Sequence, residues 1–521
     1  KRAGYEDAQT ETLSDFMARQ MSGVQVNDVQ GSPFQSDLTF RGYRASGLLG
    51  VAQGLSVYLD GVRINEAFGD VVNWDLVPEF AIGSVSLIPG ANPAFGLNSL
   101  GGALSLTTLD GRSAPGLRAE LTMGSLSRKR LDLSHGGMSD DGWQHYLSVG
   151  LFDETGWRDF SDGRLGHLSA KIGRDTEAGE FSLGLLVARS RLVGNGLVPL
   201  YTLDEDGQRT PDLGSERRSA VYTHPDLTRN RVTQLSANWR HELAGGRTLE
   251  ALTYVRRSTR DTINGDEADD DAGEGEEGEV AANAAFNRTS TSQRGLGASL
   301  ALSGKDGAHQ WQLGASLDRA RVRYEQTEQP GQFTPTRQVL PLDEPAELSA
   351  KVSGRSRSFG VYATDTWRVA PATHLTGTLR VNEARVSNQL TSVDDDSGEW
   401  VERPNESFGY RSWNPALGLA HRLAAGPTLF ANVARNNRVP TVIELGCADP
   451  EEPCRLPAGL QADPYLKQVV STTGEAGARF GTEGETRGSL TLYRSLNRND
   501  IVFSSISLSS QLGYFRNFDR T

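Results

Sequence analysis

From residue 113 onward, this chain is dominated by runs in which apolar and polar residues alternate with a period of two. In residues 144–152, for example, Leu147 and Leu151 fall on one side of an extended chain, whereas Gln144 and Ser148 fall on the other. Alternation of this kind places one face of a strand in an apolar medium and the other in water. The same pattern recurs in residues 181–188, 311–318, 375–382, 429–434 and 490–493.

The length of these runs distinguishes between two kinds of all-β fold. A soluble sandwich also alternates, so no single run excludes it. Many of the runs span about ten residues, however, which is what a tilted strand needs to cross the hydrocarbon layer of a membrane. We therefore predict a mainly β chain that forms a transmembrane antiparallel β-barrel. Tryptophans near the ends of the runs would suit interfacial aromatic girdles, and they are Trp143, Trp239, Trp311, Trp367 and Trp413.

The connections between the runs come in two lengths. Short ones alternate with long ones, and the long ones are residues 195–230, 261–291, 325–356, 387–410 and 438–468. Short turns at one end and long loops at the other are typical of outer-membrane barrels, with the long loops outside. We expect the acidic run NGDEADDDAGEGEEGEV to be a solvated, mobile surface loop. Cation capture is the alternative, although the run lacks the ordered ligand spacing of a calcium loop.

Composition excludes several other classes of protein. Only 37% of the residues are hydrophobic, mean hydropathy is −0.44, and no apolar run reaches about 18 residues, so a helical membrane protein is excluded. A net charge of −13 argues against a nucleic-acid partner. The histidines are scattered without metal-ligand spacing, and neither G-x-S-x-G nor a P-loop occurs. We expect no enzyme activity, no cofactor and no metal site.

Residues 41–108 differ in character, because their predicted strands are short and broken by glycine. The Asp-Gly pair at 60–61 between two β-type runs predicts a hairpin, since both turn residues tolerate positive φ. A helix is expected upstream over residues 11–20, with Thr10 or Thr12 as its cap. By itself this pattern predicts a compact α+β module.

Three blocks in this module also carry a resemblance to a known family. They read RGY at 41–43, VYLDGVRIN at 57–65 and IPGANPAFGLNSLGGALSLTT at 88–108. In order and spacing they resemble the plug domain of TonB-dependent outer-membrane receptors. The sequence departs from the family pattern at Pro89-Gly90-Ala91, where Arg-Gly-Pro is common, so the match is one of pattern and spacing rather than identity.

Segments of the later part of the chain resemble the same family. They are VYATDTWRV at 361–369, ARNNRVPTVIEL at 434–445, and DPYLKQVVSTTGEAGARFG at 463–481, the last with Gln468-Val469 in place of the usual Pro-Glu. The resemblance thus covers nearly the whole chain.

The fold that the resemblance implies is an N-terminal α+β plug domain, residues 1–112, inside the lumen of a barrel formed by residues 113–521. Counting strands in the sequence gives roughly 16 to 18, against about 22 in plugged transporters. The C-terminal strands are therefore expected to be missing and the barrel to be incomplete.

The function that the resemblance implies is that of a TonB-dependent transport receptor in the bacterial outer membrane, which binds a scarce nutrient and imports it to the periplasm. A ferric chelate, or siderophore, is the commonest cargo of the family, while cobalamin, a saccharide or another metal complex stays open. The expected partners are TonB, through a motif upstream of Lys1, outer-membrane lipid or lipopolysaccharide, and the small-molecule ligand. The alternative is a passive porin or a surface adhesin, but a porin would carry no plug before its first strand.

By position in the plug, the outward apices that contact ligand are expected at residues 29–37, 44–53 and 65–75. The candidate ligand contacts are Gln30, Phe34, Gln35, Arg44, Gln53, Asn65, Glu66, Phe68, Asp70, Asn73 and Trp74.

Three of these residues have an expected role. Phe68 and Trp74 would pack on the organic rim of a chelate, and Arg44 would meet its negative charge. For each candidate, packing within the plug or against the barrel is an equal alternative. Arg41 is assigned to plug–barrel structure rather than to ligand.

Two cysteines, Cys447 and Cys454, lie within GCADPEEPCRLP. A redox or metal pair is one interpretation, but the spacing lacks the C-x-x-C form and no histidine lies nearby. A loop-closing disulfide formed in an oxidising compartment is the better interpretation, and it points to the periplasm or the cell surface.

Overall fold

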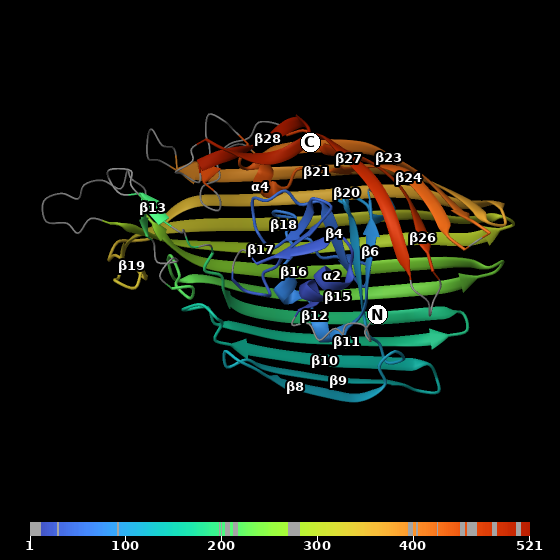
Figure 1. Cartoon of the computed structure of the whole chain (residues 1–521), viewed down its shortest axis with the longest axis horizontal. Helices are drawn as coiled ribbons and strands as arrows, with labels where there is room; N and C mark the ends of the chain where they lie inside the picture. Colours follow the sequence, from blue (N-terminus) through green and yellow to red (C-terminus); the bar gives the residue numbers. More distant parts are fainter. Residues whose placement is uncertain are drawn as a thin grey trace, which may run out of the picture.

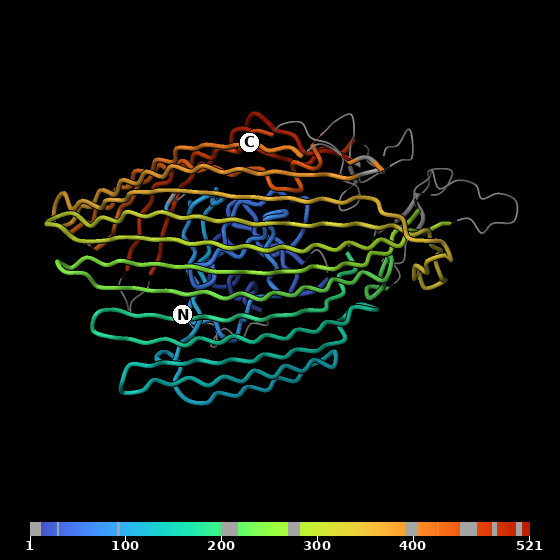
Figure 2. Tube along the Cα trace, turned by 180° about the vertical axis from the view of Figure 1, so that it is seen from behind, coloured from blue at the N-terminus to red at the C-terminus, as the bar shows by residue number. Residues whose placement is uncertain are grey.

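The computed structural model describes residues 12–521 except 29–30, 91–92, 197, 199–200, 204–208, 212–216, 269–281, 394–399, 403–404, 425, 449–453, 456–465, 482–486 and 507–511. These residues form two bodies. An α+β plug, blue in Figure 1, lies against the inner side of a large antiparallel sheet of barrel type. The view from behind in Figure 2 shows the strands of the sheet passing across the plug, so the plug lies against the middle of the sheet rather than at one edge of it.

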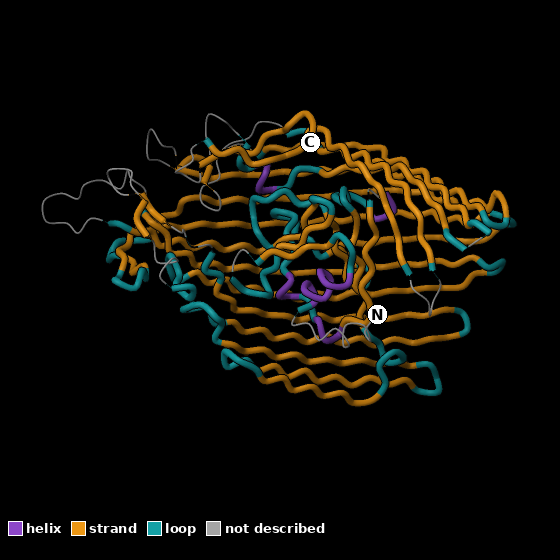
Figure 3. Tube along the Cα trace, viewed as in Figure 1, coloured by secondary structure: helices purple, strands orange, loops and turns teal. Residues whose placement is uncertain are grey.

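The plug is built from short elements, coloured by type in Figure 3. Three of its strands form one small sheet in the order β1-β2-β3, and four form a second in the order β5-β4-β7-β6. The elements are α2 (Leu13–Gln20), β1 (Val24–Asn27), β2 (Asp37–Phe40), β3 (Tyr43–Ser46), β4 (Leu55–Leu59), β5 (Val62–Arg63), η1 (Trp74–Leu76), η2 (Glu79–Ala81), β6 (Ile82–Pro89), η3 (Pro93–Phe95) and β7 (Gly102–Thr108).

Local sequence signals explain two of these elements. Helix α2 begins after Thr12, whose side chain accepts a hydrogen bond from the backbone N–H of Asp15, so the expected threonine cap is Thr12. The β4–β5 hairpin turns at Asp60 and Gly61, which have φ values of 49° and 84°. Both expectations are confirmed, because each depends on residues that are neighbours in the sequence.

The barrel sheet is a continuous ladder. Among the described residues, sixteen strands pair antiparallel in chain order, within the range expected from the sequence. They are β8 (Gly116–Met123), β9 (Lys129–Met138), β10 (Trp143–Glu154), β11 (Gly163–Thr176), β12 (Gly179–Val193), β15 (Asp226–Leu243), β16 (Arg247–Glu267), β17 (Ala284–Asp306), β18 (His309–Phe333), β20 (Glu347–Ala370), β21 (Thr373–Val393), β23 (Glu406–Arg422), β24 (Thr428–Arg438), β26 (Val469–Phe480), β27 (Gly488–Ser505) and β28 (Leu512–Arg520).

Shorter elements lie between these strands. Strands β13 and β14 form a two-stranded sheet of their own, whereas β19, β22 and β25 pair with β18, β21 and β28. Their bounds are β13 (Tyr201–Leu203), β14 (Arg209–Pro211), β19 (Val339–Pro341), β22 (Trp400–Glu402) and β25 (Cys454–Arg455), and a single helical turn, α4 (Val442–Leu445), follows β24.

Several strands extend into segments that we expected to be loops. Pairing between β16 and β17 continues to Glu267 opposite Ala284, and pairing between β18 and β20 continues to Glu328 opposite Glu347. The expected loops at 261–291 and 325–356 were therefore too long. The reason is that strand pairing does not need an apolar face, so the alternation fades before the ladder ends.

The two faces of the sheet differ as the alternation predicts. Leu147, Leu235 and Leu313 are about half exposed on the outer face, at 47%, 53% and 50%. Polar side chains on the inner face, such as Asn230 and Asn414, are buried. No described helix has the length and apolar character that a membrane span requires. The mainly β barrel around an N-terminal α+β plug is thus confirmed.

Candidate functional site

The plug is joined to the barrel wall by charged and polar contacts. Arg41 Nη1 lies 2.8 Å from Glu475 Oε2 on β26, as expected for a residue assigned to plug–barrel structure. On another side, Lys171 Nζ of β11 lies 3.2 Å from Asp60 Oδ2 at the tip of the plug hairpin. The plug is therefore held by individual interactions that can be broken one at a time, and not only by a continuous apolar core.

Asp75 makes the densest of these contacts. Its Oδ2 accepts hydrogen bonds from Ser190 Oγ at 2.5 Å and from Asn230 Nδ2 at 2.9 Å, and His167 Nε2 lies 2.8 Å from its backbone carbonyl oxygen. Burial raises the pKa of the Asp75 carboxyl, and the two hydrogen bonds oppose that rise. One plug residue thus bridges strands β11, β12 and β15.

A second junction joins the plug to the segment after β24. The backbone N–H of Ile443 in α4 donates to the carbonyl oxygen of Phe68 at 3.0 Å, and the ring of Phe68 stacks on Tyr324 with a centroid distance of 4.8 Å. Asn98 of the plug donates from its backbone N–H to the carbonyl of Asn437 at 3.0 Å. The plug and α4 are therefore in direct backbone contact.

The conformation of the α4 segment depends on a buried ion pair. Arg438 Nη1 lies 2.8 and 2.9 Å from the two carboxylate oxygens of Glu444, and their side chains are only 1% and 6% exposed. Glu444 also accepts from the backbone N–H of Thr441, whose hydroxyl in turn accepts from the N–H of Glu444. This capping box fixes the start of α4.

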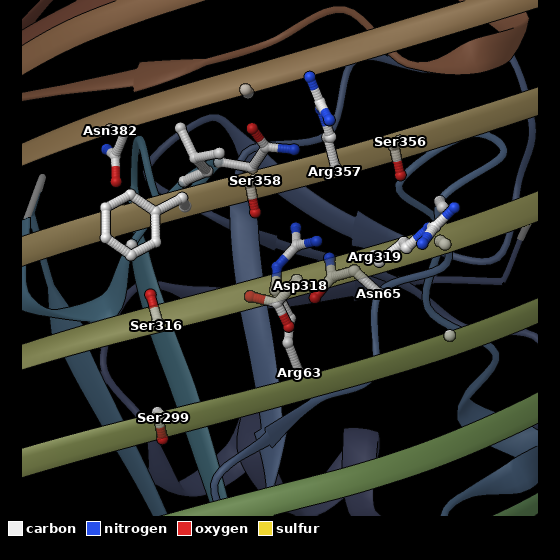
Figure 4. Close-up of a pocket in the computed structure, with 18 of the residues that line it drawn as sticks. Arg63, Asn65, Ser299, Ser316, Asp318, Arg319, Ser356, Arg357, Ser358 and Asn382 are labelled. Atoms are coloured by element: carbon white, nitrogen blue, oxygen red, sulfur yellow. The ribbon is translucent and has the colours of Figure 1, made fainter.

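A cavity of about 400 Å³ lies between the plug hairpin and strands β16 to β21. Figure 4 shows Arg63 and Asn65 of the plug beside Asp318 of β18 in this cavity. Arg63 Nη2 lies 2.5 Å from Asp70 Oδ1, and Tyr254 of β16 donates from its hydroxyl to Asp318 Oδ1 at 2.7 Å. The cavity is thus lined by groups of both charges.

Arginines from the wall complete the cavity. Arg380 of β21 donates to Asn382 Oδ1 at 2.7 Å and to Ser316 Oγ at 2.6 Å, so its charge faces neutral partners. Arg256 of β16 lies 3.9 Å from Glu66, whose Oε2 accepts from Gln293 at 2.5 Å. Burial raises the pKa of the Glu66 carboxyl, and the nearby Arg256 opposes that rise. The arrangement suits an anionic group, for which arginine forks are strong donors.

With this geometry in place, the chain can be compared with known proteins. The TonB-dependent receptor plug domain matches residues 1–103, and the TonB-dependent receptor-like β-barrel matches residues 140–521. The chain belongs to the TonB-dependent receptor family. Its members are transport receptors.

Solved structures of the same architecture include three with different cargo. The ferric-catecholate import receptor Fiu from E. coli K12, in its closed form, has a TM-score of 0.72 at 15% identity, over 100% of this chain and 75% of that one. The ferric yersiniabactin uptake receptor FyuA from Yersinia pestis has a TM-score of 0.67 at 14% identity, over 94% and 70%. The copper transporter OprC has a TM-score of 0.71 at 15% identity, over 98% and 74%.

Several of the expected ligand contacts of this receptor lie inside the plug. Gln53 accepts from the backbone N–H of Ser46 at 2.9 Å, and Asn65 accepts from that of Val57 at 2.8 Å. Trp74 donates from its indole N–H to the carbonyl of Ala45 at 2.9 Å. Gln35, Asn73 and Asp70 are also buried.

Other expected contacts lie between plug and wall. Phe34 packs edge-on against Phe152 of β10 with a centroid distance of 4.7 Å, while Glu66 and Phe68 contact the wall as described above. Arg44 is the most open of the set, with a side chain 41% exposed and 3.4 Å from Asp37. Gln30 lies outside the described residues. The ligand role of all these residues stays a prediction.

The wall residues of the cavity were not found from the sequence. Asp318, Tyr254 and Arg380 occupy polar positions in alternating runs, which marks them as facing inward. Alternation does not say which inward residue lies opposite the plug hairpin, because that depends on the register and curvature of the whole sheet.

The structure describes the side chain of only one of the two cysteines expected to pair. Cys447 is fully buried directly after α4, and its carbonyl oxygen accepts from the backbone N–H of Phe515 at 2.7 Å. The side chain of Cys454 lies outside the described residues, so the disulfide stays a prediction.

Proposed function

We propose that this receptor sits in the bacterial outer membrane and imports an anionic metal chelate, a ferric siderophore first among candidates. Ligand binds on the outward side of the plug, and TonB, acting through sequence upstream of Lys1, pulls on the plug to admit it. The observation that carries this proposal is the cavity between plug and wall, in which, among the described residues, Arg380 donates only to the neutral side chains of Asn382 and Ser316 and so keeps its charge available for an anion.

The proposed cargo rests on the charges that line the cavity and on the similarity to solved structures of transport receptors. Fiu and FyuA are described as receptors for ferric chelates, and OprC as a copper transporter. A chelate of either metal with carboxylate or catecholate groups would be compatible with cationic wall residues. The fold does not distinguish an iron chelate from cobalamin or a sugar as the cargo, so this choice is made by experiment.

The mode of transport is proposed from the plug–barrel contacts. Ion pairs between plug and wall include those at Glu475, Asp60, Glu79 and Glu66, and force applied to the plug would break such separate polar contacts one after another. A passive porin is disfavoured because the plug lies against the inner side of the sheet, where a porin would have its channel (Figure 1). Nothing specific favours an adhesin.

The test uses the full-length gene product in a strain that lacks its own receptors. Growth is measured on a panel of ferric chelates, a copper chelate, cobalamin and sugars, with and without TonB. We expect rescue by one ferric chelate and its loss without TonB. Rescue that does not depend on TonB would indicate passive diffusion, and rescue only by cobalamin or a sugar would overturn the proposed cargo.

A variant pair tests the external site. Arg44→Gln removes the most open candidate cation of the plug, whereas Arg19→Gln removes an exposed plug arginine paired with Asp15 at 3.0 Å. We expect Arg44→Gln to weaken binding of the transported chelate about tenfold, as for loss of one charge-assisted contact. Arg19→Gln should leave binding unchanged. Equal affinities of the two variants would remove Arg44 from the site.

A further inference from the structure

The cavity between the plug hairpin and strands β16 to β21 is lined by as many carboxylates as arginines that face it. They are Glu66, Asp70 and Asp318, against Arg63, Arg256 and Arg380. Three further arginines border the cavity but are exposed and alternate with less exposed residues, so they point outward; they are Arg294, Arg319 and Arg357. The facing residues thus give the cavity no net charge. An anionic group would be held there well only if one carboxylate left its place.

Two of the three carboxylates are fixed to the barrel wall. Glu66 Oε2 accepts a hydrogen bond from Gln293 of β17 at 2.5 Å, and Glu66 also lies 3.9 Å from Arg256 of β16. Asp318 is itself part of β18, and its Oδ1 accepts from the hydroxyl of Tyr254 at 2.7 Å. Moving either carboxylate would therefore break a contact made by the wall.

Asp70 is held by the plug instead. Its Oδ1 lies 2.5 Å from Arg63 Nη2, and its Oδ2 accepts a long hydrogen bond from Asn98 Nδ2 at 3.3 Å. Both partners belong to the plug. Asp70 can therefore change its partner without breaking these contacts of the wall.

A second arginine lies near Asp70 and does not line the cavity. Arg438, at the end of β24, interacts electrostatically with Asp70 as well as with Glu444. Its Nη1 alone reaches both carboxylate oxygens of Glu444, at 2.8 and 2.9 Å. Its Nε and Nη2 are buried and have no hydrogen-bond partner among the described residues. One edge of the guanidinium, which can hold a carboxylate by two parallel bonds, is thus vacant.

This vacant edge favours the arrival of a carboxylate. Burying N–H donors without an acceptor costs free energy, and the cost is larger for a charged group. Asp500 of β27 also acts electrostatically on Arg438, but its Oδ2 already accepts from the hydroxyl of Thr521 at 2.6 Å. Asp70 is the nearby carboxylate whose present partner, Arg63, has another use.

That use is in the cavity, where Arg63 and Arg380 are close enough to serve one ligand. Both interact electrostatically with Asp318, and Figure 4 shows Arg63 beside Asp318. Arg380 donates to Ser316 Oγ at 2.6 Å, two residues before Asp318 on the same face of β18. A small group lying between these positions would meet both guanidinium groups.

We propose that Asp70 exchanges Arg63 for Arg438 when an anionic group enters the cavity. Arg63 then binds the incoming group together with Arg380, and the vacant edge of Arg438 accepts the displaced carboxylate by paired N–H···O bonds. Carboxylate, catecholate and phosphate groups all suit two forked donors. Asp70 and Arg438 are positioning residues, because they act through Arg63. The inference rests on the anionic cargo proposed above and names the residues that admit it.

Arg438→Lys tests the exchange, because lysine keeps the charge but has no second edge to offer. The present contact with Glu444 uses one nitrogen, which an ammonium group can replace. Binding of citrate to the full-length receptor in a neutral detergent is measured by titration calorimetry, with trimethyl citrate as the neutral match. We expect the wild type to bind citrate at least tenfold more tightly than the ester, and Arg438→Lys to weaken citrate binding at least tenfold.

Asp70→Asn supplies the rescue. In the double variant with Arg438→Lys, Arg63 has no carboxylate to release, so citrate affinity should return at least to that of the wild type. Hydrogen exchange at the amide of Ile443, which is bonded to Phe68, reports the position of α4 and should be the same in all three proteins.

A matched control separates the site from a general change of charge. Arg411→Lys alters an arginine of β23 whose side chain is 80% exposed, and it should bind citrate like the wild type. Arg63→Gln removes one of the two arginines that meet the anion and should weaken binding at least tenfold, with or without Arg438→Lys.

Each outcome decides the matter. Equal citrate affinity of wild type and Arg438→Lys overturns the exchange, as does a loss that Asp70→Asn fails to restore. Equal binding of citrate and its ester, or no binding of either, overturns the anion site. Faster exchange at Ile443 in Arg438→Lys would assign Arg438 to the support of α4 alone. Growth on ferric chelates is scored separately, so the expected citrate pattern without uptake of any chelate would reject the proposed transport function and leave the exchange intact.

Discussion

Arg41 of the plug and Glu475 of barrel strand β26 form an ion pair across 434 residues of sequence, with Nη1 2.8 Å from Oε2. The guanidinium also lies over the ring of Tyr493 of β27, at 4.2 Å from its centroid. The two side chains are 14% and 4% exposed, so the pair is largely shielded from water. It joins the plug to the last part of the barrel.

Breaking this pair should loosen the plug. In Arg41→Gln, Glu475 keeps its hydrogen bond from Asn432 but loses its counter-charge, and we expect the plug to be destabilised by about 3 kcal/mol. Single-channel conductance reports release of the plug as the urea concentration is raised, and the measurement is the urea concentration at the midpoint of that release. Arg19→Gln breaks an exposed pair, and it should change the free energy of plug release by less than about 0.5 kcal/mol. Equal midpoints for the two variants would refute a structural role for the pair.

The buried pair Arg438–Glu444 should control the α4 segment. Glu444→Gln leaves Arg438 charged and buried without a counter-ion, at a cost of about 3–5 kcal/mol. We expect faster hydrogen exchange at the amide of Ile443, because its bond to Phe68 depends on the position of α4. Unchanged protection at Ile443 would show that α4 holds its position without the ion pair.

Phe68 should anchor the plug to the wall through packing. Its ring is only 1% exposed and stacks on Tyr324, so Phe68→Ala should cost about 3–5 kcal/mol through lost contacts and the cavity left behind. The check is the urea midpoint for plug release. As a control, Phe480→Ala removes a ring that is 48% exposed on β26 and should have little effect. A small effect for Phe68→Ala would favour its use as a ligand contact rather than an anchor.

Asp75 should make the plug less stable as pH rises. Burial raises the pKa of this carboxyl above its unfolded value of about 3.9. Its contribution is therefore fully favourable below about pH 3.9 and is lost as pH rises through the folded pKa. Relative to Asp75→Asn, which cannot titrate, the wild type should lose stability as pH rises above about 4. A difference in urea midpoint that stays constant with pH would contradict this.

Cys447 and Cys454 should be joined in the oxidised protein. Thiol titration of the unreduced, denatured receptor should find no free thiol, and two after reduction. Free thiols before reduction would reject the pair. In the denatured receptor, Cys454→Ser should then give one titratable thiol, that of Cys447, which is buried near α4 in the folded state.

Much of the fold could be predicted because its signals are local. The Asp60-Gly61 turn and the Thr12 cap depend on neighbours in the chain, and the alternation in β10 and β18 assigns each residue to an outer or inner face. Strand ends were less predictable. Beyond the apolar surface the outer face of β16 to β18 is mostly polar, so pairing continues to Glu267 and Phe333 without the alternation that marks it nearer the short turns.

The ligand role of the candidate site residues stays a prediction. Position in the plug indicated which segments face outward, and in the structure Gln53, Asn65 and Trp74 form hydrogen bonds to the plug's own backbone, which the sequence did not indicate. In the sequence, a polar side chain that binds a ligand cannot be told from one that forms a hydrogen bond with an otherwise unpaired backbone group of the plug. Only the contacts separate these two uses.

By itself, the sequence determined that this is a β-barrel chain with an N-terminal α+β module, and which side of each strand meets the apolar medium, because these follow from residues that are close in the chain; that the module is a plug inside the barrel was implied by the family resemblance. The tertiary structure alone decided which residues meet, such as Arg41 with Glu475 and Phe68 with α4. The physical reason is that register and curvature are properties of the whole sheet. A shift of one residue in a single ladder would give every one of these side chains a different partner.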